Sequence, residues 1–434
     1  MQGKQAAIFF TISLVLTAVL LPVVAFRTPD GQKTNTLFHE RPEEKTLHRL
    51  DAISPYEYGM KVGFIFNAQF KFLSTIVRII DKTRLQNTFR DDQIQYIEQF
   101  FPFFAEELRG ISKTTHIDVH TLLRLQSRLS SLLSSECTTA LATGKATRNN
   151  ETFLLFNMDS SVEDIRHILV STLLHRLFSF KIWVVQICTM KYSYAFWGIP
   201  ILLEYPFLNE KGVGWSSPGT IFTKNESRYI DEGPGMSTML LEKLAMMTCE
   251  NVSEVACLYK NTERASPKKE TWCHQYDSSS SCFCDSDGGI LCIEQTHQYI
   301  LTVFGNSTEI TGAPEGIIWH ANHHQWLDPM RTGSVFPSEY PSSALRAERA
   351  YELLINQYGN ITLEFCKLIT SDHKGGFDVN GKDSGDICRH PDNTSSILTA
   401  FSWIIMPKQH MVYWTHTSPC EGIFFDYDFS EIFE

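Results

Sequence analysis

The sequence has no long block of lysine or arginine, no glycine-rich phosphate loop and no internal repeat. Nucleic-acid-binding chains carry such basic blocks and nucleotide-binding chains carry such loops, so we expect neither partner here. What remains is a chain of 434 residues with a net charge of −11. Hydrophobic residues make up 43% and aromatic residues 12% of it, which predicts a folded protein of two or three domains or one large layered domain.

One hydrophobic stretch stands apart at the N-terminus. Residues 6–26 carry no charge, with Lys4 before them and Arg27 after them. A helix of this length can cross a bilayer, so residues 1–26 are predicted to be a cleaved signal peptide or an uncleaved signal anchor. Residues 27–50 are polar and predict a linker. Either outcome sends the rest of the chain into the secretory pathway, as a single-pass membrane protein with a lumenal or extracellular body or as a secreted or lysosomal protein.

Sequons and cysteines support the same route. Six Asn-x-Ser/Thr sites are expected to be glycosylated: Asn150, Asn225, Asn251, Asn306, Asn360 and Asn393. The chain also has 11 cysteines, an odd number that leaves one thiol unpaired or paired with another chain in an oxidising compartment. Cys273, Cys282 and Cys284 fall in a Ser/Asp-rich stretch, where we expect disulfides in an exposed loop rather than zinc.

Helical periodicity dominates the next part of the chain. Apolar residues recur at helical spacing in the stretch that begins at Ser54, on both sides of Pro102, and after Asp118, the expected N-cap of the last helix. Residues 51–136 are therefore expected to form a helical segment that is kinked at Pro102. This segment is a candidate for a separate subunit.

The hydrophobic period changes to two after this segment. Alternation around residues 139–141 and 153–155 predicts two paired strands, and further strand pairs alternate with helical pairs. One of these helices is expected to begin with Ser342 or Ser343 as its cap. The pattern predicts two stacked sheets with helices outside, so residues 137–434 are expected to form a four-layer αββα body of the α+β class.

Cys137 lies where the helical segment ends and the first strand begins. A thiol is a nucleophile only as its thiolate, so it needs a base, and the residues that surround the nucleophile in papain-like enzymes are absent. If the chain is cut before Cys137, the new α-amine has an ordinary pKa of roughly 7.7–8.0. That amine can serve as the general base on the nucleophile's own residue.

The residues around Cys137 also resemble a known family. The stretch "ECTTA", followed by "LLFNMD", is similar to the nucleophile hairpin of the acyl-coenzyme A:6-aminopenicillanic acid acyltransferase family. Members of this family are self-processing N-terminal-nucleophile (Ntn) hydrolases. The resemblance covers about residues 55–425 and continues, in the family's order, through these stretches: "YEYGMKVG", "IDVHTLLRLQSRL", "EYPFLNEKGVGWSSPGT", "GPGMSTMLLEKLA", "GGILCIEQTHQYILTV", "HANHH", "DICRHPD" and "SPCEG".

The resemblance implies roles for individual residues. Cys137 would be both the processing residue and the acyl-accepting nucleophile, with cleavage between Glu136 and Cys137. Asp159 would hold the Cys137 α-amine by a charge-assisted hydrogen bond, and Asn322 would donate its side-chain amide to the tetrahedral oxyanion. Thr139 shares the face of Cys137 at period two and is expected to line the site.

The resemblance also implies an Ntn-hydrolase sandwich that attacks a linear amide and forms a thioester at its cysteine. The expected partner is a small-molecule amide or N-acyl substrate, with no cofactor, and self-cleavage would leave an α/β heterodimer. A membrane is expected as a partner only through residues 6–26, if they are not removed.

The sequence departs from the family at two positions. The penicillin-forming member has glycine before its nucleophile, where this chain has Glu136, and a carboxylate there is expected to slow self-cleavage or make it pH-dependent. That member also has an arginine near the start of a late strand, where this chain has Ser396. Arg389 is the candidate to replace this arginine in substrate binding.

Other interpretations stay open. Cys137 can instead be half of a disulfide, and the chain can be a catalytically inactive glycoprotein that uses the fold as a binding module. A lysosomal lipid amidase or phospholipase B-like hydrolase is a further alternative. His320, His323 and His324 have the spacing of a metal site, but no HExxH pattern or acidic partner accompanies them in the sequence, so we expect no metal.

Overall fold

The computed structural model describes residues 47–83, 97–132, 136–161, 181–225, 227–231, 233, 235–265, 280–375, 385–391 and 397–433. The predictions made for residues 6–26, Cys273, Asn393 and Ser396 lie outside this part of the chain. Within it, no helix combines the length and the apolar character needed to cross a bilayer.

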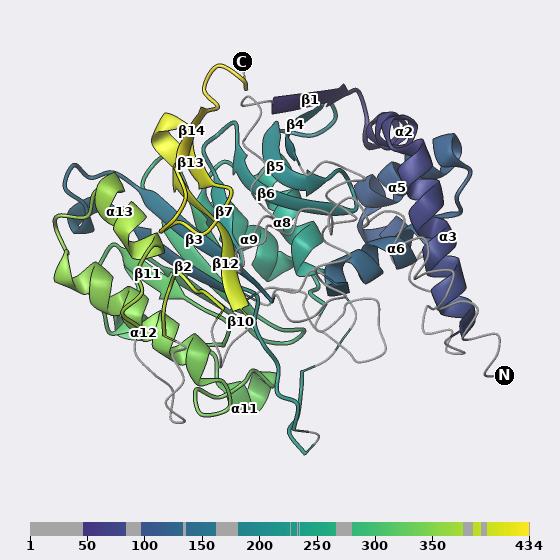
Figure 1. Ribbon diagram of the computed structural model, residues 1–434. Coiled ribbons are helices and arrows are strands. Elements are labelled where there is room, and N and C mark those ends of the chain that lie inside the picture. Colours follow the sequence, from purple (N-terminus) through teal and green to yellow (C-terminus); the bar gives the residue numbers. More distant parts are fainter. Residues whose placement is uncertain are drawn as a thin grey trace, which may run out of the picture.

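Two stacked β-sheets form the centre of the molecule (Figure 1). The eight-stranded sheet has the order β1-β4-β5-β6-β7-β8-β9-β10, and the six-stranded sheet has the order β11-β2-β3-β12-β13-β14. The strands are β1 (Leu47–Ala52), β2 (Glu136–Ala142), β3 (Phe153–Ser161), β4 (Lys181–Ile187), β5 (Tyr194–Ile199), β6 (Leu203–Asn209), β7 (Gly214–Ser216), β8 (Ser280–Cys284), β9 (Ile290–Gln295), β10 (Ile300–Phe304), β11 (Ile317–His320), β12 (Ile397–Met406), β13 (Met411–Thr415) and β14 (Phe425–Asp428). Neighbouring strands are antiparallel except β1 and β4, which are parallel.

Helices cover the outer face of each sheet. The helices α8 (Thr238–Thr248) and α9 (Val252–Asn261) pack on the eight-stranded sheet. The helices α12 (Pro341–Asn356) and α13 (Leu363–Thr370) pack on the six-stranded sheet, and two short helices, α10 (Thr308–Thr311) and α11 (Pro329–Thr332), lie in its connections. The order of layers is therefore helix, sheet, sheet, helix, as the alternation of periods predicts.

The alternation of side chains along β2 assigns its residues to two different cores. Cys137 and Leu141 belong to the core between the two sheets, whereas Ala140 and Ala142 belong to the core between the six-stranded sheet and the helices α12 and α13. Successive residues of a strand point to opposite faces, so the Cys137 side chain and the side chains of its sequence neighbours face different layers.

The described residues before Cys137 are mainly helical, as predicted, and the four longer helices among them pack beside the body (Figure 1). They are α2 (Pro55–Ile65), α3 (Asn67–Thr83), α5 (Pro102–Thr115) and α6 (Val119–Leu132).

Pro102 is the first residue of α5, so the predicted kink is a break between two helices. The Asp118 carboxylate accepts a hydrogen bond of 2.8 Å from the Thr121 amide, which confirms the predicted cap. A Cβ at Gly59 would lie 2.0 Å from the Glu107 carbonyl oxygen, so glycine is what lets α2 approach α5 this closely.

The predicted end of the linker at residue 50 is wrong, because β1 begins at Leu47 and pairs with β4 of the body. Leu50 and Ala52 are buried at alternate positions of β1. The polar residues His48, Arg49 and Asp51 around them gave this short strand the composition of a linker.

Two other local predictions are corrected. The cap of α12 is Tyr340, and Pro341 occupies the first helical position, so Ser342 and Ser343 lie inside the first turn. Cys282 and Cys284 lie in the buried strand β8 rather than in an exposed loop, and neither forms a disulfide. The strand pairs with β7 and β9, and the Ser/Asp-rich composition just before these cysteines gives no indication of either partner.

Candidate active site

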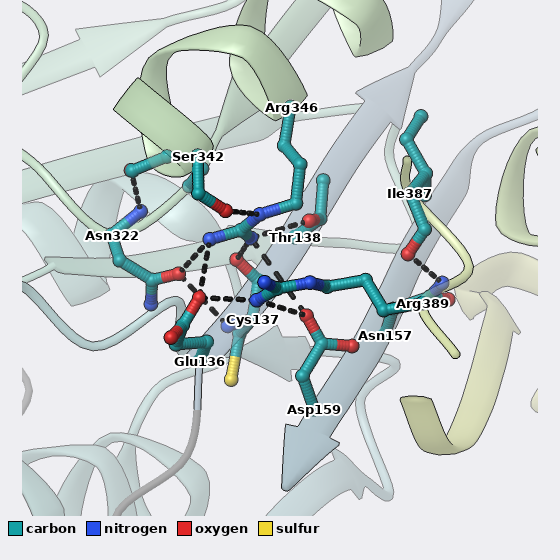
Figure 2. Close-up of polar contacts among 12 residues, drawn as sticks. Glu136, Cys137, Thr138, Asn157, Asp159, Asn322, Ser342, Arg346, Ile387 and Arg389 are labelled. Carbon is teal, nitrogen blue, oxygen red and sulfur yellow. Dashed lines mark hydrogen bonds and ion pairs between the residues drawn. The ribbon is translucent and has the colours of Figure 1, made fainter. Parts of the chain in front are cut away.

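Cys137 is the second residue of β2, a strand in the interior of the six-stranded sheet. Its side chain is 2% exposed. Its amide N–H donates to Asn322 Oδ1 at 3.0 Å, and its carbonyl oxygen accepts from Arg346 Nη1 at 2.6 Å (Figure 2). Figure 2 shows the Cys137 sulfur pointing away from the guanidiniums of Arg346 and Arg389. The backbone of Cys137 therefore faces a polar cluster, while its sulfur faces the other side of the strand.

Asn322 follows β11, the strand that pairs with the other edge of β2. Its Oδ1 accepts from the Cys137 amide and from Arg346 Nη2 at 2.7 Å, and its Nδ2 donates to the Gly219 carbonyl oxygen at 2.7 Å. Because a guanidinium carries only donors, Oδ1 has to face Arg346, which fixes the orientation of the amide. An amide NH₂ group has two hydrogens, so the contact with Gly219 leaves one for an oxyanion. The predicted role of Asn322 as an oxyanion donor remains a prediction.

Asp159 lies on β3 directly opposite Glu136, so it is a diagonal neighbour of Cys137 across the hairpin. It is completely buried, and its Oδ1 accepts from Thr399 Oγ1 at 2.7 Å. Its Oδ2 has no hydrogen-bond partner in the described structure, and the nearest guanidinium nitrogens, of Arg346 and Arg389, are 3.9 Å away. Burial raises the pKa of Asp159 to about 6, although the two arginines act in the opposite direction.

Glu136, on the other side of the proposed scissile bond, is held by three side chains. Its carboxylate accepts from the Tyr340 hydroxyl, from Arg389 Nη1 and from Arg346 Nη2, the last at 3.2 Å. Burial alone would raise the pKa of Glu136, but the charges of Arg389 and Arg346 outweigh it and hold that pKa below its ordinary value. Arg389 was predicted to bind substrate; in the intact chain its partner is Glu136.

Arg346 is the central residue of this cluster, and the sequence analysis missed it. It is fully buried on α12 and contacts Cys137, Asn322 and Glu136. Glu348, two residues further along this helix, is exposed, so the charges of the helix do not by themselves single out Arg346. A signal was present, since Arg346 shares one helical face with the small residues at positions 342 and 350, which are buried.

Thr139 lies on the Cys137 face of β2, and its hydroxyl joins the two sheets. Thr139 Oγ1 donates to the Leu155 carbonyl oxygen at 2.7 Å and lies 2.7 Å from Ser216 Oγ on β7. It is 1% exposed, so the hydroxyl is engaged inside the protein. The predicted contact with substrate stays a prediction.

The three histidines near Asn322 take part in structural hydrogen bonds. His320 uses both ring nitrogens, with Nε2 at 2.8 Å from Glu294 Oε1 and Nδ1 at 2.6 Å from the Ala321 carbonyl oxygen. His323 Nδ1 lies 2.7 Å from Ser343 Oγ, and His324 Nδ1 lies 2.9 Å from Thr332 Oγ1. The sequence analysis found no acidic partner for these histidines; Glu294 is that partner for His320, and it comes from β9.

Comparison with known proteins identifies no family. No protein-family model and no curated protein match the chain. Among solved structures, the chain is similar to a mutant of the conjugated bile acid hydrolase from Clostridium perfringens, at 13% identity and a TM-score of 0.39, over 68% of this chain and 93% of that one. It is similar to penicillin V acylase from Agrobacterium tumefaciens at 12% identity and a TM-score of 0.38, over 68% and 87%. TM-scores this low assign neither fold nor activity, so the function has to come from the residues themselves.

Proposed function

We propose that this chain is a self-processing Ntn hydrolase or acyltransferase, of the acyl-coenzyme A:6-aminopenicillanic acid acyltransferase type, with Cys137 as its nucleophile. One observation carries the proposal. Cys137 is the second residue of an interior strand in a stacked-sheet core, and its amide N–H donates to Asn322 Oδ1. The buried carboxylate of Asp159 lies one position away across the hairpin. This arrangement supplies a nucleophile, an oriented side-chain amide and an acid beside one peptide bond.

The first reaction is proposed to be scission of the chain. Cys137 Sγ attacks the carbonyl carbon of Glu136, and the C–N bond between Glu136 and Cys137 breaks. The electron pair of that bond stays on nitrogen, which takes up the thiol proton, and a thioester forms. Water then hydrolyses the thioester, which yields the Glu136 carboxylate and regenerates the thiol. The products are a fragment that ends at Glu136 and one of 298 residues (434 − 136) that begins with Cys137.

The second reaction is proposed to be turnover of an external amide. The new α-amine of Cys137 takes the thiol proton, and the sulfur attacks the substrate carbonyl. Asn322 donates its remaining amide hydrogen to the oxyanion, an interaction worth about 3–4 kcal/mol in a preorganised site. Asp159 Oδ2 is the acceptor proposed for the ammonium form of the amine. The thioester then passes its acyl group to water or to an amine, and the substrate is a small amide or N-acyl compound.

The reaction is proposed to take place in the lumen of the secretory pathway, where the N-terminal segment and the body would form an α/β heterodimer. Sequon position supports this setting, because four asparagines in the described part of the chain are exposed: Asn150, Asn225, Asn306 and Asn360. The fifth, Asn251, is half-buried and caps α9. A lysosomal lipid amidase would fit the same site and compartment.

A denaturing gel with N-terminal sequencing tests the proposal. The mature protein should split at the bond before Cys137, and Cys137→Ala should stay one chain and lack amidase activity. The matched control is Cys188→Ala, since Cys188 is an exposed cysteine on another strand end. A Cys137→Ala protein that still hydrolyses amides would overturn the mechanism.

The burial of this cluster favours a second candidate function, a binding module without catalysis. Cys137 is 2% exposed, and Glu136 is held by Tyr340, Arg346 and Arg389. A mature protein in which the Glu136–Cys137 bond stays intact, and in which Cys137→Ala leaves ligand binding unchanged, would select this function.

A further inference from the structure

A second cluster of histidine and cysteine side chains includes both sequence neighbours of Arg389. His373 follows α13, Cys388 and His390 flank Arg389, and Cys420 follows β13. The ligand atoms of these four side chains all lie within 4.8 Å of one another. The proposed function requires none of them.

Backbone and side-chain hydrogen bonds bring the three segments together. The Cys388 amide donates to the Asp372 carbonyl oxygen at 2.9 Å, which places it beside His373 at the end of α13. Thr399 of β12 makes two hydrogen bonds with the backbone of Arg389. Thr399 Oγ1 accepts from the Arg389 amide at 2.8 Å, and the Thr399 amide donates to the Arg389 carbonyl oxygen at 2.9 Å. Ser418 Oγ donates to the Thr399 carbonyl oxygen at 2.8 Å, which brings in the turn that carries Cys420. Thr399 of β12 therefore connects the segments that carry Arg389 and Cys420, and Cys388 connects them to the end of α13.

The spacing of the four groups is close to that of a metal centre. His390 Nε2 lies 3.1 Å from Cys420 Sγ and 3.8 Å from Cys388 Sγ, and the rings of His373 and His390 are 5.0 Å apart between centroids. Zinc–sulfur bonds of about 2.3 Å and zinc–nitrogen bonds of about 2.0–2.1 Å, arranged as a tetrahedron, put neighbouring ligand atoms about 3.3–3.8 Å apart. Thiolate and imidazole are also the ligands that zinc takes in structural sites.

We infer that His373, Cys388, His390 and Cys420 bind one zinc ion. Four protein ligands complete a tetrahedral shell and leave no position for substrate or water, so the ion is structural. Sequence spacing predicted no metal here because the ligands come from three separate segments.

The position of the site explains what the ion does for the rest of the fold. Arg389 stands between two of the ligands in the sequence, and its guanidinium contacts Glu136. An ion bound to both Cys388 and His390 therefore also fixes the backbone of Arg389 between them. Arg389 becomes a residue of fixed position next to the proposed scissile bond.

Metal analysis of the purified full-length protein is the first test. Inductively coupled plasma mass spectrometry should find about one zinc ion per chain. Replacement by Co²⁺ should produce the absorption of thiolate-to-cobalt charge transfer. A zinc-free protein in which peptide mapping finds Cys388 disulfide-bonded to Cys420, or finds both as thiols, would overturn the inference.

Variants locate the ion. The double variant Cys388→Ser/Cys420→Ser should lose the zinc and the cobalt absorption, whereas Cys188→Ser/Cys257→Ser, at two exposed cysteines elsewhere, should keep both. His373→Ala, at an exposed position, should weaken zinc retention during dialysis against a chelator even if the double variant does not fold. Stoichiometric zinc in His373→Ala with unchanged retention would contradict the ligand set. Zinc content and zinc retention do not depend on chain scission, so they test this inference even if the scission proposed above does not occur.

Discussion

Two buried clusters of charged side chains in the described part of the chain balance their charges differently. At the junction of the N-terminal segment and the body, Lys243 Nζ lies 2.8 Å from Glu107 Oε2 and 3.0 Å from Glu204 Oε2. The hydroxyls of Tyr58 and Tyr194 donate to Glu204, each at 2.8 Å. This junction cluster thus has two acids for one base, with α5 supplying one acid and the body supplying the rest.

The cluster around Cys137 has two acids, Glu136 and Asp159, for two bases, Arg346 and Arg389. Each cluster still leaves one buried carboxylate oxygen without a hydrogen-bond partner in the described structure: Glu107 Oε1 in one and Asp159 Oδ2 in the other. Burial raises the pKa of Glu107 to about 7 and that of Asp159 to about 6. In both clusters burial outweighs the attraction of the cations, whether a cation is in contact, as Lys243 is with Glu107, or 3.9 Å away, as the two arginines are from Asp159.

The largest expected effect comes from Arg346→Ala. It leaves two buried acids with one arginine and removes the donors to Cys137 and Asn322, so we expect a loss of about 3–5 kcal/mol in the free energy of unfolding. Chain scission should also fail. Denaturant unfolding and a denaturing gel measure the two effects.

The control for Arg346→Ala is Arg349→Ala, three residues along the same helix. Arg349 is partly exposed and pairs with Asp372 at 2.8 Å, so its loss should cost at most about 1 kcal/mol. Equal losses for the two variants would show that Arg346 has no special place in the cluster.

A somewhat smaller effect is expected for Lys243→Met in the junction cluster. Removal of the only cation there leaves Glu107 and Glu204 facing each other, which should destabilise the protein by about 3 kcal/mol. Lys191→Met, at an exposed lysine, should change the free energy of unfolding by less than about 0.5 kcal/mol. If Lys243→Met is as stable as its control, the junction cluster does not hold the segment to the body.

Asp159→Asn tests the pH dependence of the Cys137 cluster. A carboxyl whose pKa is raised by folding stabilises the folded state below its unfolded pKa and loses that contribution as pH rises through the folded pKa. For Asp159 the loss should fall between about pH 4 and pH 6 and amount to at most about 3 kcal/mol. Unfolding measured across this range should show a shallower decline in Asp159→Asn than in the parent; parallel curves would contradict the buried, raised pKa.

The smallest effect at acidic pH is expected for Glu107→Gln. At pH 4 the Glu107 carboxyl is protonated in both the folded and the unfolded chain, so stability there should change by less than about 1 kcal/mol. Between about pH 4.5 and the raised pKa of about 7, the parent should lose stability and Glu107→Gln should not. A matched series of unfolding curves from pH 4 to pH 8 decides this, and a parent curve that rises between pH 4.5 and pH 7 would refute the sign.

Local patterns were enough to predict much of the fold. The period-two alternation of β2 and β3 and the cap at Asp118 are properties of a few neighbouring residues, and both appear as predicted. The candidate residues Cys137, Asn322 and Asp159 also lie in one region, as their motifs implied. A pattern read along the chain finds such features because their causes are local.

What was missed depends on partners far apart in the sequence. Arg346 looks like a surface residue until α12 is placed over β2, and Glu294 looks like a strand glutamate until β9 lies beside His320. The short strand β1 is recognisable only through β4. In each case the stabilising contact is made across the fold, so neither composition nor periodicity contains it.

The pairing of β1 with β4 has a consequence for any processed form of the protein. A cut before Cys137 would leave β1 on the smaller fragment, although it forms the outermost strand of a sheet that belongs to the larger one. Arg49 of β1 also donates to the Ile432 carbonyl oxygen at 2.8 Å, close to the opposite terminus. Removal of the smaller fragment would expose the backbone N–H and C=O groups of β4, whose sequence is "KIWVVQI". This apolar strand would then be an open sheet edge that can pair with other chains. The smaller fragment would therefore protect the larger one from aggregation for as long as the two stay associated. The larger fragment would need it in order to remain in solution.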